Sequence, residues 1–400
     1  MLYRRNRTLQ RLAQATAIVG ALAFSSSAHA QNHSSSSLLV KVISGVNIAD
    51  IAANYNVSVS GGVPDLSIYR ITAPNAAAAS VVAKILSYDQ RVTFSQGDSG
   101  VQISEITAAP FQLAFDDGFD AGGYVNQGAY AQVDQGNINV LPSYRRSIVA
   151  VLDTGVNANH PALAGKLLPG ANFVEPGTAP SDVPDGANNN ALGHGTMVTG
   201  IVTAVSPNSV VLPVKVLNSD GVGTILNVIS GIHYAVRHGA DVINMSFGTA
   251  QYSPALETAL EEAANNGVVL VAAAGNASSN APTYPAASNV VIGVGAVNAD
   301  NTLASFSNYG VDVSVVAPGV GIYSTYYTGG YASWSGTSFA APFVSGEAGE
   351  LAARHPFWNS YFLGWLIVGT SDSVDSLNQG YAGQLGTGII DIQEALHPDF

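Results

Sequence analysis

The sequence predicts an α/β protein with a doubly wound, mostly parallel sheet, preceded by a small α+β domain. Aliphatic and β-branched runs alternate with helical patterns after residue 147, which is typical of parallel strands covered on both faces. The first hundred residues instead suggest the order strand–helix–strand–strand–helix–strand, a ferredoxin-like pattern. Of the 400 residues, 47% are hydrophobic and only 10% are charged, which favours compact domains over a disordered chain.

Residues 1–30 have the layout of a secretory signal peptide. A basic start is followed by an apolar core at Ala15–Phe24 and by small residues up to Ala30, where we expect cleavage. The core is too short for a membrane anchor, and the residues after Arg4-Arg5 fit a twin-arginine signal poorly. We therefore expect a secreted protein, extracellular or periplasmic, without disulfides because it has no cysteine.

The net charge argues against several classes of partner. The formal charge is −13, and residues 1–30 carry four arginines and no acid, so their removal leaves −17 (−13 − 4). An acidic protein is a poor binder of nucleic acid or of anionic membrane. No later segment is long and apolar enough to suggest a membrane span after signal removal.

Residues 31–96 form the predicted small domain, and residues 97–128 a linker. The small domain is expected to hold strands at 38–43, 57–60, 66–71 and 92–95 and helices at 47–54 and 76–86. The linker is rich in Gly, Asp and Ala and has weak periodicity. An unrelated accessory domain is the alternative for residues 31–96.

Residues 129–400 form the predicted large domain. Its strands are expected at 148–152, 210–217, 242–245, 268–273 and 290–297, and its helices at 194–205, 225–238, 254–266 and 338–353. In such sheets the functional site forms beyond the carboxyl ends of the strands.

Four motifs carry residues suited to acyl transfer. Asp153 and Asn276 each follow a buried strand, His194 lies in Gly-His-Gly-Thr before a helical stretch, and Ser338 lies in Gly-Thr-Ser-Phe-Ala-Ala-Pro. Each residue alone is better explained as a turn or capping residue. Together they give the order Asp…His…Ser, one of three chain orders known for serine triads.

These four motifs and their order resemble the subtilisin-like serine peptidases, the subtilases, from about Val149 to about Leu396. The resemblance implies a secreted serine endopeptidase that processes itself from a zymogen. It also implies that residues 31–96 are a propeptide that assists folding and inhibits the enzyme, with a maturation site within residues 97–128. Protein or peptide substrates and a monomer are expected, and the alternative is an inactive binding or scaffold protein on the same fold.

The resemblance assigns the catalytic roles. Ser338 would attack the scissile carbonyl while His194 takes its proton and returns it to the leaving amine. Asp153 would fix the imidazole tautomer and stabilise the imidazolium. The side-chain amide of Asn276 and the backbone N–H of Ser338 would bind the oxyanion.

Substrate-binding residues follow from the same resemblance. The two sides of the primary pocket and the strand that would pair with substrate lie in three separate motifs. A threonine stands at the pocket floor, where many relatives have a glycine. We therefore expect a shallow pocket for small or medium side chains and peptide binding by strand addition. Ser246, Phe247 and Gly248 would line one side of the primary pocket, and Ala274 and Gly275 the other side. Gly221, within Leu217–Gly223, would belong to the strand that pairs with substrate, and Thr283 is the threonine at the pocket floor.

Other serine and metal motifs are excluded by their context. Gly97-Asp-Ser-Gly100 resembles a chymotrypsin-type nucleophile, but the only histidines before Ser99 are His29 and His33. The order of the motifs also disfavours an α/β-hydrolase lipase or esterase, because there the acid and histidine follow the serine. The absence of His-Glu-x-x-His disfavours a zinc peptidase, and no cofactor or metal is expected for catalysis.

Three departures from the family pattern lead to further expectations. Ala162 stands where many subtilases have an aspartate that ligates calcium, so a structural calcium site is not identifiable here. Phe339 replaces a frequent methionine after the nucleophile, which predicts resistance to peroxide. The aromatic residues of 356–366 are expected either to pack in the core or to form a docking patch.

Overall fold

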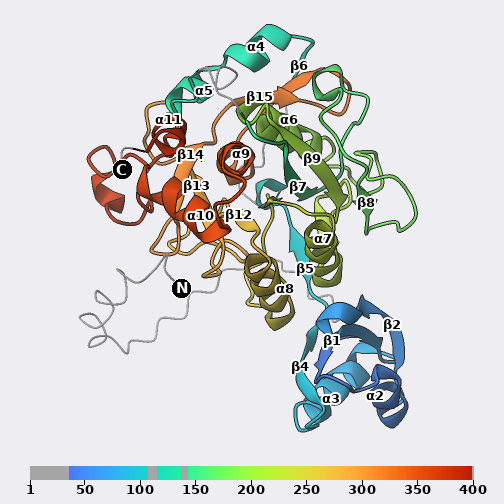
Figure 1. Cartoon of the computed structure of the whole chain (residues 1–400). Helices are drawn as coiled ribbons and strands as arrows, with labels where there is room; N and C mark the ends of the chain where they lie inside the picture. Colours follow the sequence, from blue (N-terminus) through green and yellow to red (C-terminus); the bar gives the residue numbers. More distant parts are fainter. Residues whose placement is uncertain (1–35, 107–114, 137–142, 399–400) are drawn as a thin grey trace, which may run out of the picture.

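The computed structural model describes residues 36–106, 115–136 and 143–398, so the predicted signal peptide lies outside the described residues. Figure 1 shows a small domain, in blue, beside a larger domain that holds the rest of the chain. Both predicted architectures are present.

The small domain is a four-stranded antiparallel sheet with two helices. Its strands lie in the order β2-β3-β1-β4, and each half of the domain contributes one helix, as the strand–helix–strand pattern predicts. Two asparagine side chains cap the helices, Asn47 before α2 and Asn75 before α3. The elements are β1 (Ser37–Val42), α2 (Ile48–Tyr55), β2 (Ser58–Val63), β3 (Ile68–Thr72), α3 (Ala76–Leu86) and β4 (Val92–Gly97).

The large domain is centred on a seven-stranded sheet in the order β14-β13-β12-β11-β7-β9-β8. All six neighbouring strand pairs are parallel. Its central strands are buried along their whole length, which explains their continuous apolar sequence. The strands are β7 (Ser147–Asp153), β8 (Ala171–Asn172), β9 (Ser209–Lys215), β11 (Val242–Met245), β12 (Val269–Ala273), β13 (Ile292–Val297) and β14 (Val315–Pro318).

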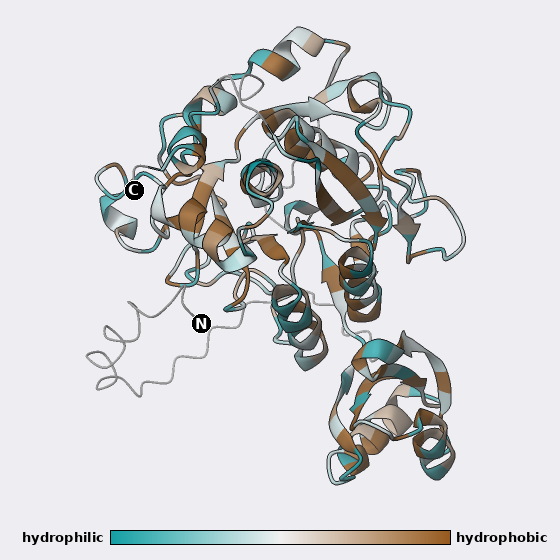
Figure 2. Cartoon of the chain, viewed as in Figure 1, coloured by the Kyte–Doolittle hydropathy of each residue, from teal (hydrophilic) through white to brown (hydrophobic). Residues whose placement is uncertain are grey.

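Helices cover both faces of this sheet. One hydrophobic cluster joins the sheet to α6 and α9, and a second cluster on the other face joins it to α7 and α8. Figure 2 shows the corresponding hydrophobic colouring along the strands, with hydrophilic colouring on outward faces of α8. The helices are α6 (His194–Val205), α7 (Ile225–Arg237), α8 (Pro254–Asn265), α9 (Thr337–Arg354), α10 (Ser360–Gly369) and α11 (Ile392–Leu396).

The segment predicted as a linker contains ordered elements that pack on the large domain. Its strand β6 pairs with β16, and its strand β5 pairs with β10. These elements are too short for a detectable period, and they form only because partners distant in sequence are available. The elements that lie in this segment or begin at its end are β5 (Gly100–Gln102), β6 (Phe115–Gly118), α4 (Ala121–Asn126) and α5 (Gly128–Gln132). The partner strands in the large domain are β10 (Val222–Thr224) and β16 (Tyr331–Trp334), and β16 also pairs with β15 (Ile322–Thr325).

The small domain packs on α7 and α8, and residues at its end and directly after it bond to the first turns of both helices. The side chain of Gln96 accepts a hydrogen bond from Ala255 N at 3.0 Å, at the start of α8. The carboxylate of Asp98 accepts one from Leu226 N at 3.1 Å, at the start of α7. Negative charge or a polar acceptor at these positions satisfies free N–H groups and the positive end of the helix dipole.

The buried face of α10 is aliphatic, and three aromatic residues in and before this helix are exposed. Leu363, Leu366 and Ile367 bury the inner face of the helix, whereas Phe357, Tyr361 and Trp365 remain exposed. Core packing therefore does not account for these three rings. Across the described part of the chain, no helix combines the length and the hydropathy that a membrane span requires.

Candidate active site

The sheet changes direction of winding between β7 and β11. The chain places β9 on one side of β7 and β11 on the other, so the carboxyl ends of β7 and β11 flank a crevice. Asp153 is the last residue of β7, and Ser246 directly follows β11. The predicted site residues thus meet where the topology favours a functional site.

Asp153 and His194 are hydrogen-bonded and fully buried. His194 Nδ1 donates to Asp153 Oδ1 at 2.8 Å, and Thr154 N donates to the same oxygen at 2.7 Å. Helix α6 begins at His194 because Gly193 adopts φ +92°, and a Cβ there would lie 2.2 Å from the ring of Tyr326. The imidazole is therefore held by both its acid partner and its backbone.

Ser338 is the second residue of α9, where backbone N–H groups have no partner within the helix. Pro342 has no N–H to donate to the Ser338 carbonyl, which instead accepts from Ser246 Oγ at 2.8 Å. Ser338 Oγ in turn lies 3.0 Å from Ser246 O. These contacts tie the start of α9 to the end of β11.

The carboxylate of Glu105 occupies the position directly in front of Ser338. Its Oε1 accepts from Ser338 N at 3.1 Å, and its Oε2 accepts from Ser338 Oγ at 2.8 Å. The same Oε2 lies 4.0 Å from His194 Nε2, so Ser338 Oγ and His194 Nε2 are at most 6.8 Å apart, the sum of 2.8 Å and 4.0 Å. A side chain at Gly336 would collide with Glu105, because its Cβ would lie 1.9 Å from Oε1.

Two buried nitrogen atoms of this site have no hydrogen-bond partner among the described residues. They are His194 Nε2 and Asn276 Nδ2. The other end of the Asn276 amide is fixed, since its Oδ1 accepts from both the N–H and the hydroxyl of Thr337 at 2.9 Å. An amide that is oriented by its oxygen and free at its nitrogen is suited to bind an oxyanion.

The environment of His194 favours its protonated form. Burial lowers the pKa of the imidazole, but the charges of Asp153, Glu105 and Asp182 together raise it above its ordinary value. The ring also contacts Trp334 and Phe339, with ring centroids 5.7 Å and 5.2 Å away. Phe339, which follows Ser338, therefore packs directly against the imidazole.

The predicted substrate-binding residues form two backbone edges, and Thr283 lies close to Gly248 and Gly275. Gly221 and Gly248 bond to the backbone of β5 and of the residue that follows it, so this segment lies between them. Thr283 lies between Ala274 and Gly248: its N–H donates to Ala274 O at 2.9 Å, and a Cβ on Gly248 would lie 2.3 Å from its hydroxyl. A Cβ on Gly275 would lie 3.2 Å from the Thr283 methyl group.

Phe247 lies differently from its neighbours. Its side chain is buried in the second hydrophobic cluster. Ser99, the excluded chymotrypsin-type serine, lies at the junction of the domains, where its carbonyl accepts from Ile225 N.

Two functional candidates, Glu105 and Asp182, were missed by sequence reasoning. The buried carboxylate of Asp182 accepts from Gly193 N, Thr196 N and Thr196 Oγ1 at 3.1, 3.1 and 2.7 Å, and from Thr154 Oγ1 at 3.2 Å. It therefore holds both sides of His194 and the residue after Asp153. Its position in a loop eleven residues before Gly193 gave no periodic signal, and Glu105 lies in the segment predicted as a linker.

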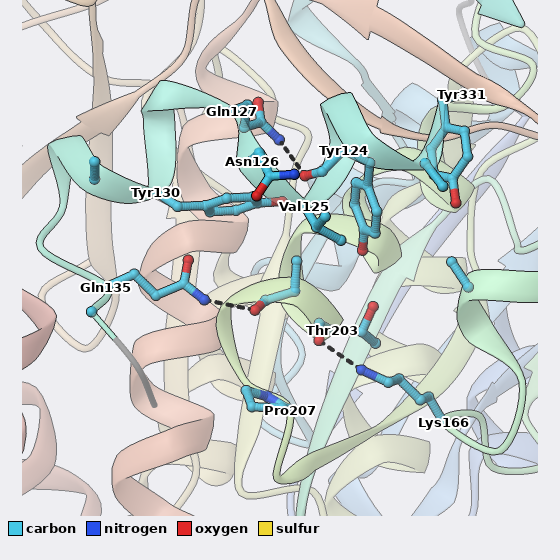
Figure 3. Close-up of a pocket in the computed structure, with 15 residues that line it drawn as sticks. Tyr124, Val125, Asn126, Gln127, Tyr130, Gln135, Lys166, Thr203, Pro207 and Tyr331 are labelled. Carbon is cyan, nitrogen blue, oxygen red and sulfur yellow. Dashed lines mark hydrogen bonds between the residues drawn. The ribbon is translucent and has the colours of Figure 1, made fainter. Parts of the chain in front are cut away.

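A separate cavity of about 750 Å³ lies between α4, α5 and α6. Figure 3 shows Lys166 pointing toward Thr203, and its ammonium donates to the Thr203 carbonyl at 3.0 Å. Burial, with the charge of Arg146, lowers the pKa of Lys166. Ala162, the position lacking the expected calcium ligand, lines the same cavity.

Potential metal ligands are scattered over the described ranges 36–106, 115–136 and 143–398. In these ranges no group of three or more His, Cys, Asp or Glu side chains is arranged to hold a metal ion. Asp153, His194 and Ser338 lie together at this edge of the sheet, with Glu105 between His194 and Ser338, and their side chains and the nearby backbone donors are suited to acyl transfer.

Known proteins resemble both the sequence and the fold. A family model described as the subtilase family matches residues 145–388. Thermitase from Thermoactinomyces vulgaris is 44% identical over 216 residues, which cover 52% of this chain and 75% of that protein. Subtilisin DY from Bacillus licheniformis is 39% identical over 260 residues, covering 62% and 89%.

A solved structure is similar over most of the chain. Fervidolysin from Fervidobacterium pennivorans, described as a keratinolytic enzyme related to subtilisin, aligns with a TM-score of 0.73 and 25% identity. The alignment covers 91% of this chain and 61% of fervidolysin. The matched part therefore includes residues outside the region of the family model.

Proposed function

The chain belongs to the subtilase family and is a serine endopeptidase, and from this premise we propose that Asp153, His194 and Ser338 are its catalytic triad. The observation that carries the proposal is that His194 is hydrogen-bonded to Asp153 on one side, while on the other side the same Glu105 oxygen lies close to both His194 Nε2 and Ser338 Oγ. These residues are 185 positions apart in the chain (338 − 153) and meet at one edge of the sheet.

Each residue has one role in the proposed reaction. His194 Nε2 takes the proton of Ser338 Oγ as the hydroxyl attacks the carbonyl, while Asp153 holds Nδ1–H and stabilises the imidazolium. Ser338 N and Asn276 Nδ2 donate to the oxyanion. Asn276 Nδ2 has no hydrogen-bond partner and can donate directly, whereas Ser338 N must first break its hydrogen bond to the Glu105 carboxylate.

We propose that the described chain is the auto-inhibited zymogen, with residues 31–96 as the inhibitory propeptide. Two observations on the segment that directly follows residues 31–96 support this. Strand β5 lies between Gly221 and Gly248, and the Glu105 carboxylate accepts the hydrogen bond that the Ser338 hydroxyl would otherwise donate to His194. Displacement of residues 100–105 would free both backbone edges and release the nucleophile.

The proposal also includes secretion, a monomeric enzyme and independence from metal in catalysis. The signal-type layout of residues 1–30 supports export, and the acidic charge of the remainder argues against nucleic acid as a partner. The close approach of Thr283 to Gly248 and Gly275 supports a preference for small side chains before the cut.

The test of function uses the full precursor and its Ser338→Ala variant. The wild-type precursor should shorten itself, hydrolyse casein and react with a fluorophosphonate probe, and the variant should do none of these. Processing by purified Ser338→Ala alone would contradict the proposed triad. A folded wild-type protein that neither hydrolyses casein nor reacts with the probe would instead support the inactive scaffold.

A further inference from the structure

The chain segment Gly100–Ile103 is bound to the large domain as an added antiparallel strand. On one side, β5 pairs with Val222–Thr224, and Ile103 N donates to Gly221 O at 3.0 Å. On the other side, Gln102 and Gly248 exchange two hydrogen bonds, of 3.0 and 2.9 Å. A segment held at both edges by backbone bonds is bound as an extended peptide substrate would be.

The pairing fixes which residue comes next to Ser338. Gln102 is opposite Gly248, so extension of the same antiparallel register by two residues places Ser104 opposite Ser246. The carbonyl of Ser246 lies 3.0 Å from Ser338 Oγ. The side chain of Glu105 already contacts Ser338, which shows that the chain passes the nucleophile at this point.

We propose that the first processing cut falls at the peptide bond between Ser104 and Glu105. This inference rests on the proposed function, because it needs Ser338 as the nucleophile. It adds the bond, the register and the residues that the site recognises.

The side chains of the strand define the class of peptide that the site accepts. Val101 and Ile103 are 1% and 0% exposed, whereas Gln102 between them is exposed. Counted back from the cut, the first residue is Ser104, which is small, and the second and fourth are Ile103 and Val101, which are apolar and β-branched. A serine in the first position fits the pocket that Thr283 narrows.

The structure shows the state that precedes cleavage. Residues 104–106 form a single turn, and the Glu105 carboxylate accepts hydrogen bonds from both Ser338 N and Ser338 Oγ. This side chain must withdraw before the Ser104 carbonyl can reach the same donors. The Glu105 contact therefore delays the cut without moving the strand.

The reaction is an ordinary hydrolysis. Ser338 Oγ bonds to the carbonyl carbon of Ser104, and its proton passes through His194 to the nitrogen of Glu105 as the C–N bond breaks. Water then attacks the ester, gives a proton to His194 and releases a carboxylic acid at Ser104. The proton returns to Ser338 Oγ, so one water is consumed for each bond cut.

The test follows the precursor through an acid-quenched time course, with intact mass and terminal sequencing of the earliest fragments. We expect one fragment that ends at Ser104 and a complementary fragment that begins at Glu105. Earliest fragments with other ends would overturn the inference. If casein hydrolysis remains normal in that case, the proposed function stands while the assigned bond is wrong.

Matched variants test the register independently of the ends. Ile103→Ser should slow the first cut about 10- to 100-fold through the lost burial of an apolar side chain. Gln102→Ser changes the exposed neighbour and should alter the rate by less than about threefold. Equal effects of the two variants would contradict the proposed alternation.

A synthetic peptide of residues 99–106 provides a measurement that does not depend on folding of the variants. The mature enzyme should cut it between Ser104 and Glu105, and a peptide with Glu105→Pro should resist, because proline has no amide hydrogen and alters the geometry at this bond. Efficient cleavage of the first peptide at another bond would overturn the inference.

Discussion

Replacement of Asp182 by asparagine tests whether this buried carboxylate positions His194. Asparagine keeps one oxygen, which can still accept from Gly193 N and Thr154 Oγ1. It places an NH₂ group where Oδ2 now accepts from Thr196 N and Thr196 Oγ1 at 3.1 and 2.7 Å. The Thr196 N–H then faces another donor inside the protein.

The expected loss follows from that one unsatisfied donor. A buried N–H without an acceptor costs about 1–3 kcal/mol, which lowers Tm by about 2–12 °C in a domain of this size. Thr196 lies two residues after His194, so a shift at the start of α6 moves the imidazole. We expect kcat to fall about 10- to 100-fold, with KM changed by less than about twofold.

The pH dependence separates positioning from general destabilisation. The charges that raise the pKa of His194 come from Asp153, Glu105 and Asp182. Burial raises the pKa of Asp182 itself, while its hydrogen bonds and the charge of Lys215 favour the ionised carboxylate. Loss of the Asp182 charge lowers the pKa of His194, so the imidazole is neutral at lower pH. The acid limb of kcat/KM should therefore move to lower pH in Asp182→Asn.

The assay measures kcat, KM and the pH profile on a soluble peptide substrate, together with Tm. Glu350→Gln is the matched control, because Glu350 is equally buried and hydrogen-bonded but lies twelve residues, about 18 Å, along α9 from Ser338. It should lower Tm and leave the acid limb in place. An Asp182→Asn enzyme with a lower Tm but an unchanged kcat and acid limb would refute the positioning role.

Four other outcomes are expected. Burial and the charge of Asp391 raise the pKa of Glu347 well above its ordinary 4.5, so the native state keeps a proton that the unfolded state releases, and the stability of the wild type falls as pH rises from about 4.5. In urea unfolding, Glu347→Gln should lack this fall. Curves of unfolding free energy against pH that run parallel for the variant and the wild type would contradict the prediction. EDTA should lower Tm by less than about 10 °C, because the Lys166 ammonium already places a positive charge in the cavity beside Ala162; a larger fall would show a structural ion. Thr283→Gly should raise the ratio of kcat/KM for peptides with an aromatic residue before the cut to kcat/KM for peptides with alanine there by about tenfold or more. An unchanged ratio would show that Thr283 does not limit the size of the accepted side chain. Activity should survive dilute peroxide because Met197 and Met245 are fully buried, and rapid inactivation with oxidation of either residue, located by peptide mapping, would contradict this.

The sequence predicted the elements whose pattern repeats along the chain. The strands ending at Asp153 and before Asn276, and the helices beginning at His194 and Ser338, agree with the structure within a residue or two. Continuous apolar runs predict buried parallel strands because both faces of such strands are covered. Glycines and small residues mark where those strands and helices begin and end.

Elements that depend on distant partners were not predicted. Strands β5 and β6 have four residues or fewer, and they exist because Val222–Thr224 and β16 lie beside them. The exposed positions of Phe357, Tyr361 and Trp365 likewise followed from how α10 docks, which the aromatic composition did not reveal.

The fold class and the candidate residues Asp153, His194, Asn276 and Ser338 could be predicted from the sequence, because periodicity and short motifs are local properties of the chain. That Glu105 covers Ser338 and that Asp182 holds the residues around His194 became visible in the three-dimensional structure. Each set of contacts comes from one side chain and joins segments that are 233 residues apart for Glu105 and 11 to 14 residues apart for Asp182. No periodic pattern encodes such contacts, since they form only when the sheet and its helices have brought the segments together.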